Sequence, residues 1–159
     1  MSLMADNPNL QQSLGGLEKT LNEYFGKKAP QLPGNVKDII VALAPWFTLI
    51  GLILSIPLVL IAFGLGAMVA PVSFLAGPQA GLSYGVNYMV AMVVLAVSLV
   101  LEALAVPGLF SRSIKGWRFA YWAALVGFVS NLVQFNVVGG LIGAVIGFYF
   151  LFQIRDRYK

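Results

Sequence analysis

The longest uncharged run in the chain is the feature that most restricts its fold. No aspartate, glutamate, lysine or arginine occurs between Asp38 and Glu102, a stretch of 63 residues. A second run of 36 uncharged residues lies between Arg118 and Arg155. A membrane-spanning helix needs about 20 apolar residues to cross about 30 Å of hydrocarbon, so the first run can hold two crossings and a loop. We therefore expect an integral membrane protein.

The composition favours membrane helices over other architectures. Hydrophobic residues make up 59% of the chain and charged residues 10%, whereas soluble domains average about 45–50% and about 25%. The apolar runs are continuous and lack the alternation that the strands of a membrane β-barrel require. We therefore predict an all-α fold, a polytopic helical membrane protein with four transmembrane helices and an N-terminal amphipathic helix at the membrane interface.

Residues 1–35 form the polar N-terminal segment. Within it, leucines and aromatic residues recur at spacings of three and four, which predicts an apolar stripe on one face of a helix: Leu10, Leu14, Leu17, Leu21, Tyr24 and Phe25. Asn7 followed by Pro8 is a typical helix start, and Gly26 is a typical end. We expect this helix to lie on the membrane surface with its lysines toward anionic headgroups. A short coiled coil with a partner and a flexible tail are the alternatives.

The membrane domain is predicted over residues 36–159, after a linker that contains two prolines. Its helices are expected at about residues 36–70, 84–106, 117–134 and 138–155. The stretch 71–83 is predicted to be an uncharged loop, because its glycines and prolines favour turns. Pro57 is expected to kink the first helix, since proline removes a backbone hydrogen bond.

The second uncharged run is short for two crossings. Its 36 residues form about 54 Å of helix, whereas two crossings need about 60 Å. The alternative is a re-entrant hairpin whose polar apex stays inside the membrane. We expect two full crossings with a turn near residues 135–138, because polar side chains in hydrocarbon need partners. The apex side chains are expected to cap helix ends or bond neighbouring helices, or else to line a cavity: Ser130, Asn131, Gln134 and Asn136.

The basic residues predict the orientation. The connections near 71–83 and 133–138 contain none, whereas the connection 108–118 and the C-terminus are basic. By the positive-inside rule the basic connections are cytoplasmic, and both termini then lie on that side of the inner membrane. Although the net charge is +4, we expect these bases to contact anionic lipid headgroups and not nucleic acid: Lys27, Lys28, Arg112, Lys115, Arg118, Arg155 and Arg157.

Three glycines fall four residues apart on the last predicted helix: Gly139, Gly143 and Gly147. Small residues at this spacing let two helices approach closely in lipid, where burial of apolar surface cannot drive association. The spacing therefore predicts a helix-packing face, a glycine zipper. Its partner is either another helix of the same chain or a second copy.

Glu102 is the only ionisable side chain embedded in a predicted membrane helix. Such residues are costly in a bilayer and raise the hypothesis of a proton or ion site. A structural role is the competing interpretation, because Glu102 precedes Pro107 by about one turn. There its carboxylate can reach headgroup water or pair with Arg112 or Lys115.

The sequence contains no pattern typical of an enzyme. It has no cysteine and no histidine, which removes thiol chemistry, the commonest metal ligand and the commonest general base. No second carboxylate accompanies Glu102 within the membrane runs. We therefore expect no catalytic site, metal or cofactor. The expected function is a non-catalytic membrane protein that binds lipid surface or a partner through its N-terminal helix. A small transporter or channel subunit using Glu102 and the Pro57 kink is the alternative.

Two stretches carry a resemblance to other proteins. They are LEKTLNEYFGKKAPQLPGNVKDII near the N-terminus and IGFYFLFQIRDRYK at the C-terminus. Both resemble segments of small uncharacterised four-helix integral membrane proteins of bacteria, and the resemblance extends over about residues 17–159. It implies a location in the bacterial plasma membrane. It implies no activity and carries over no catalytic or binding residue.

Overall fold

The computed structural model describes residues 8–134 and 136–159. This part of the chain is all-helical, which confirms the all-α part of the predicted fold class; the four crossings and the interfacial helix stay predictions. In order, its elements are α1 (Pro8–Leu21), the π-helix η1 (Asn22–Lys28), α2 (Gly34–Ser73), the 3-10 helix η2 (Phe74–Ala76), α3 (Pro78–Phe110), α4 (Ile114–Val133), α5 (Val137–Gln153) and the 3-10 helix η3 (Arg155–Arg157). Asn7, the expected capping residue of the first helix, lies outside the described residues.

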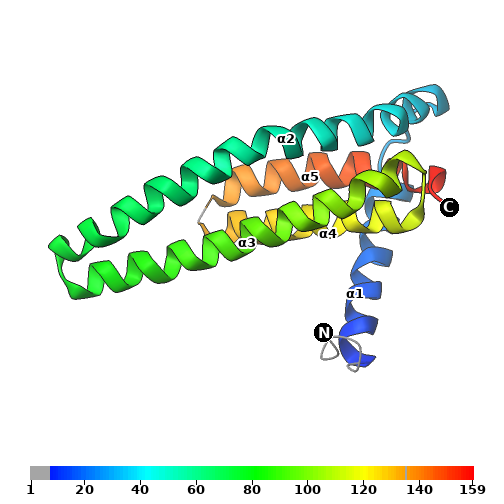
Figure 1. Cartoon of the computed structure of the whole chain (residues 1–159). Coiled ribbons are helices and arrows are strands. Elements are labelled where there is room, and N and C mark those ends of the chain that lie inside the picture. Colours follow the sequence, from blue (N-terminus) through cyan, green and yellow to red (C-terminus); the bar gives the residue numbers. More distant parts are fainter. Residues whose placement is uncertain (1–7, 135) are drawn as a thin grey trace.

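Helices α2 to α5 form an up-and-down bundle (Figure 1). Helix α3 packs against α2 on one side and α4 on the other, and α4 packs against α5. The start of α2, the end of α3, the start of α4 and the end of α5 lie together, and the C-terminus lies beside them. We call this the basic end, because it carries Lys37, Arg112, Lys115, Arg118, Arg155, Arg157 and Lys159. The α2–α3 hairpin extends past the α4–α5 hairpin at the other end.

Three helical stretches in the described part are long and apolar enough to cross a membrane. They are Gly34–Ala76, Pro78–Phe110 and Val137–Arg157. Most large apolar side chains of α2 and α3 are exposed on the bundle surface, as expected for helices whose solvent is hydrocarbon. Helix α4 is not among the three stretches, because basic, aromatic and amide side chains lower its mean hydropathy.

The helices are longer than the sequence predicts. The loop expected over 71–83 is mostly helical, since α2 continues to Ser73 and α3 begins at Pro78. Gly77 makes the sharp turn with a φ of 114°, a conformation that side chains disfavour. Pro78 then occupies the first turn of α3, where its missing N–H costs no hydrogen bond. This glycine-proline pair therefore begins a helix at a tight corner.

Prolines inside the helices do not end them. Helix α2 runs unbroken through Pro45, Pro57 and Pro71, and α3 continues past Pro107 to Phe110. In an all-helical bundle the neighbouring helices and nearby hydroxyl groups can compensate for the backbone bond that a proline removes.

The buried core lies at the basic end, between α3, α4, α5 and the start of α2. Its centre is Trp117, which is 0% exposed. The Trp117 ring stacks on Tyr121, with 5.7 Å between centroids, and meets Phe152 edge-on at 5.2 Å. Its indole N–H donates to the Leu151 carbonyl at 2.8 Å, so the one polar atom of the buried ring has a partner.

Helices α3 and α4 are in tight backbone contact at Gly108 and Gly116. A Cβ built on either glycine would overlap the backbone of the other. Only hydrogen atoms fit between the two backbones at this crossing. The pair brings the end of α3 against the start of α4 and thereby sets the register between the two helices.

We expect Gly116→Ala to lower the thermal stability of the protein in detergent by about 1–3 kcal/mol, because the added methyl group forces the two backbones apart. Gly127→Ala is the matched control on the same helix, since a Cβ there meets nothing within 4 Å. That control should be neutral or slightly stabilising, as alanine is the better helix former. Equal effects of the two substitutions on the melting temperature would contradict the close approach.

Candidate functional site

A buried glutamine holds the N-terminal segment against the basic end. Gln153 is 1% exposed, and its Nε2 donates to the Phe25 carbonyl at 2.8 Å. Its Oε1 accepts a hydrogen bond from the Leu32 N–H at 3.1 Å. Tyr149, one turn earlier on α5, donates its hydroxyl to the Pro30 carbonyl at 2.7 Å. Helix α5 thus binds both η1 and the linker through backbone groups.

Helix α1 is also joined to the bundle by charge. The Glu18 carboxylate lies 2.8 Å from the Arg155 guanidinium and 3.7 Å from that of Arg118. The Glu18 side chain is only 16% exposed, so this pairing is less screened than a fully exposed one. Leu21 and Phe25 pack against the buried core nearby. Figure 1 shows that α1 leaves the basic end across the long axis of the bundle.

The C-terminal residues are bound to the connection between α3 and α4. The Lys159 N–H donates to the Arg112 carbonyl at 3.0 Å, and the Ile114 N–H donates to the Lys159 carbonyl at 2.8 Å. Burial raises the pKa of the neighbouring Tyr158 hydroxyl, and Arg112 opposes that shift. The phenol is therefore uncharged at neutral pH and adds no negative charge to the basic end.

The structure divides the seven bases expected to contact lipid headgroups into two groups. Four have acidic partners among the described residues: Lys28, Arg118, Arg155 and Arg157. Their partners are Glu23 for Lys28, Glu18 for both Arg118 and Arg155, and Asp38 for Arg157. Within residues 8–134 and 136–159 no acid pairs with the other three, Lys27, Arg112 and Lys115. Headgroup contact stays a prediction for all seven.

Glu102 lies beside a cavity of about 490 Å³ between α2, α3 and α4. Small side chains form most of its lining: Thr48, Gly51, Ala105, Ala120, Ala123, Ala124 and Gly127. Neither Arg112 nor Lys115 forms an ion pair with Glu102 in the described part of the chain. The same part contains no cluster of three side chains suited to a metal ion. Glu102 therefore lines a cavity in which the described residues supply no second ionisable side chain.

The spaced glycines of α5 line a smaller cavity of about 160 Å³ shared with α4. A Cβ on Gly143 or Gly147 would meet nothing within 4 Å. At Gly140 it would lie 2.7 Å from the Asn131 Cβ, so the tight approach of α4 and α5 occurs there. The packing role of Gly139, Gly143 and Gly147 stays a prediction, within the chain or between copies.

The polar side chains at the apex of α4 and α5 bond to one another and to their own helix. Gln134 Nε2 donates to the Ser130 hydroxyl at 2.9 Å, and Asn131 Nδ2 donates to the Gly127 carbonyl at 2.9 Å. Asn136 Nδ2 donates to Asn131 Oδ1 at 3.0 Å. Asn136 and Gln134 also flank the ends of the two helices. The polar side chains of the apex therefore form hydrogen bonds near the helix ends, and some of them also line two of the cavities.

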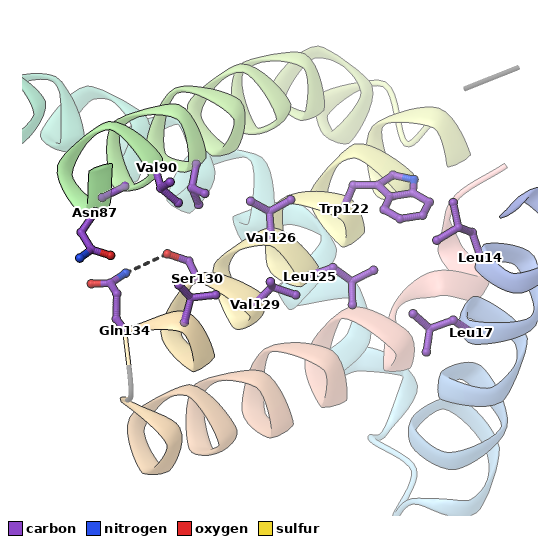
Figure 2. Close-up of a pocket in the computed structure, with 13 residues that line it drawn as sticks. Leu14, Leu17, Asn87, Val90, Trp122, Leu125, Val126, Val129, Ser130 and Gln134 are labelled. Carbon is purple, nitrogen blue, oxygen red and sulfur yellow. Dashed lines mark hydrogen bonds between the residues drawn. The ribbon is translucent and has the colours of Figure 1, made fainter. Parts of the chain in front are cut away.

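A third cavity, of about 770 Å³, runs between α3 and α4 and is bounded by α1 at one end. We call it the α3–α4 groove (Figure 2). Its walls are mainly apolar, formed by side chains that include Val90, Val94, Trp122, Leu125, Val126 and Val129. Leu14 and Leu17 of α1 lie beside Trp122 and Leu125 at one end. Asn87, Ser130 and Gln134 form the polar opposite end.

Sequence reasoning did not find this groove or the role of Gln153. The groove is built from common apolar residues on three helices, and nothing in their spacing along the chain shows that they meet. Gln153 is a single amide in an apolar run. The available signal is that Gln153 is the one amide side chain in α5 and ends this otherwise apolar helix, where a buried amide needs partners.

Comparisons of the chain with protein-family models, with curated proteins and with solved structures found no match.

We expect Gln153→Met to loosen the N-terminal segment, because it leaves the Phe25 carbonyl and the Leu32 N–H without partners, at about 1–3 kcal/mol for each unpaired group. Trypsin should then cleave after Lys27 or Lys28 at least about fivefold faster, since cleavage follows local opening. Gln79→Met, at the exposed start of α3, is the control and should leave the cleavage rate unchanged. Identical digestion of both variants would show that the Gln153 hydrogen bonds do not hold the segment.

Proposed function

We propose that the protein is a non-catalytic integral membrane protein that crosses the inner membrane four times and binds the cytoplasmic lipid surface through α1. The orientation of α1 carries the proposal. This helix projects from the basic end, transverse to the long axis of the bundle, with Leu14 and Leu17 beside the apolar walls of α3 and α4. A helix in this orientation on a bundle that spans a bilayer lies along the membrane interface.

Two bands of aromatic side chains support the placement in the membrane. Trp46 meets Phe110 edge-on near the basic end, with 5.1 Å between centroids. At the other band Tyr84 and Tyr88 stack on each other, and the Tyr88 ring lies over Gly66. Helix α2 rises about 30 Å between Trp46 and Gly66, which equals the thickness of the hydrocarbon core. Tryptophan and tyrosine concentrate at the two interfaces of a membrane.

The depth of the α4–α5 turn supports four crossings over a re-entrant hairpin. Asn87, which precedes Tyr88, lines the groove together with Ser130 and Gln134. The polar apex is therefore level with the tyrosine band. Helix α4 also begins at Ile114, before Arg118, and its 20 residues extend about 30 Å. Both crossings extend beyond the uncharged run, because α4 includes the basic residues at its start and the apolar stretch Val137–Arg157 includes those at its end.

Single cysteines can test this topology, because the chain contains none. In intact cells Gln79→Cys and Asn136→Cys should react with a membrane-impermeant thiol reagent. Ser111→Cys, in the basic connection, should react only after the membrane is opened. Labelling at position 79 without labelling at 136 would favour the re-entrant hairpin. Labelling at position 111 in intact cells would show that the basic connection faces outward, opposite to the proposed orientation.

Spin labels on the full-length protein in lipid nanodiscs can test the position of α1. Labels replacing Leu14 and Leu17 should be more accessible to oxygen, which concentrates in hydrocarbon. Labels replacing Gln12 and Lys19, on the opposite face of the helix, should be more accessible to a water-soluble nickel complex. Equal access of the nickel complex to all four positions would place α1 in water. Spin–spin broadening between copies would favour the coiled coil instead.

A small transporter or channel subunit is the second candidate function. The observation that favours it is the cavity of about 490 Å³ beside Glu102, on a helix that packs against α2, which contains Pro57. A carboxylate in a membrane cavity is suited to bind a proton or a cation. Flux measurements on the purified protein in liposomes distinguish the two functions. A proton or ion flux that is abolished by Glu102→Gln would favour the transporter or channel function over the non-catalytic one.

A further inference from the structure

The α3–α4 groove has the dimensions of a site for a chain-like molecule. Its volume of about 770 Å³ falls within the range of about 300–1,000 Å³ typical of small-molecule sites. Along α4 the groove extends from Trp122 to Gln134, which is about 18 Å of helix. One leaflet of a bilayer contributes about 15 Å of hydrocarbon. The groove is thus as long as the lipid chains that surround it.

The two ends of the groove differ in chemistry. At the basic end, Leu14 and Leu17 of α1 close it with apolar side chains. At the other end Asn87 and Gln134 extend toward each other across its mouth (Figure 2). No charged side chain occurs among the residues that line the groove. An occupant that matches this lining has an apolar tail toward α1 and an uncharged polar head at the mouth.

The hydrogen bonds at the mouth of the groove indicate which polar groups the head of the occupant should carry. Gln134 already donates its Nε2 to Ser130, and Asn87 donates its Nδ2 to the Ser83 carbonyl at 2.9 Å. The amide oxygens of Gln134 and Asn87 have no hydrogen-bond donor among the described residues. These oxygens can accept from a ligand that carries hydroxyl groups.

The walls of the groove do not suit a helix of a second copy. Helices pack in membranes through small residues, which let their backbones approach. Here the walls present bulky side chains, including Trp122, Leu125, Val126 and Val129, and Ala91 is the only small apolar residue among the lining. A flexible acyl chain fits between such side chains better than a second helix does.

From these observations we infer that the α3–α4 groove binds one single-chain lipid with a hydroxyl-bearing, uncharged head, of the kind a monoacylglycerol represents. The hydroxyl groups donate to the amide oxygens of Asn87 and Gln134, and the acyl chain runs along α4 to Leu14 and Leu17. This inference rests on the proposed membrane placement. In that placement the mouth of the groove lies level with the tyrosine band, at the membrane interface opposite the basic end.

Trp122 supplies the measurement, since it lines the groove and bromine atoms quench an indole only on contact. The test uses the full-length Trp46→Phe variant in phospholipid nanodiscs, in which fully buried Trp117 remains as an unquenched background. A monoacylglycerol brominated in mid-chain should quench Trp122 saturably. Half-saturation should occur at a mole fraction at least tenfold below that of the methyl ester with the same brominated chain. Linear quenching, equal for both probes, would overturn the inference.

Substitutions identify the parts of the site. Ala91→Phe fills the groove and should remove the saturable quenching, whereas Ala96→Phe, on an exposed part of the same helix, should preserve it. In the Gln134→Leu or Asn87→Leu variant, the half-saturation mole fractions of the monoacylglycerol and the methyl ester should differ by no more than about twofold. In the control Gln79→Leu, the tenfold difference should remain. Retention of the tenfold preference in both mouth variants would overturn the assignment of the head.

Two further outcomes separate this inference from its alternatives. In the Trp122→Phe variant, brominated phospholipid should quench the exposed Trp46. No quenching of Trp46 would contradict the membrane placement itself, whereas quenched Trp46 with linear quenching of Trp122 would overturn the groove site alone. A change in cross-linked oligomer size by Ala91→Phe, with an unchanged monoacylglycerol curve, would identify the groove as an interface between copies.

Discussion

The hydrogen bonds of Trp117 and Gln153 hold together the part of the molecule on which the rest depends. The Trp117 indole joins α4 to α5 through the Leu151 carbonyl, and Gln153 joins α5 to the N-terminal segment through Phe25 and Leu32. All of these polar atoms are at least partly buried, where an unpaired group is costly. Because apolar burial cannot drive helices together within lipid, such specific bonds and close contacts determine which helices meet.

The close approach at Gly108 and Gly116 has a consequence far from the basic end. With the end of α3 held against the start of α4, the two helices run side by side, and Asn87 and Gln134 line the same end of the groove between them. The polar apex of the α4–α5 hairpin then lies at the depth of Tyr88. The same contact that orders the core therefore positions the mouth of the α3–α4 groove.

Helix α1 takes part in both of the proposed lipid contacts, the one at the basic end and the one in the α3–α4 groove. Glu18 pairs with Arg118 and Arg155, which joins α1 to α4 and to η3 at the basic end. In that position Leu14 and Leu17 line one end of the groove. A lipid in the groove and a lipid surface beneath α1 would then both act on the position of α1, although they occupy opposite leaflets.

Charge and hydropathy along the chain are local properties, so the sequence by itself determined the membrane class, the all-α fold and the position of the basic residues at one end. The sequence also indicated Glu102 as a candidate proton or ion site, although the cavity beside it could not be predicted. Only the tertiary structure decided the helix ends near Pro78, the tight contact at Gly140, and the groove. The physical reason is that these features depend on the relative rotation and register of different helices, which a few backbone contacts and buried hydrogen bonds select and which no periodicity within a single helix records.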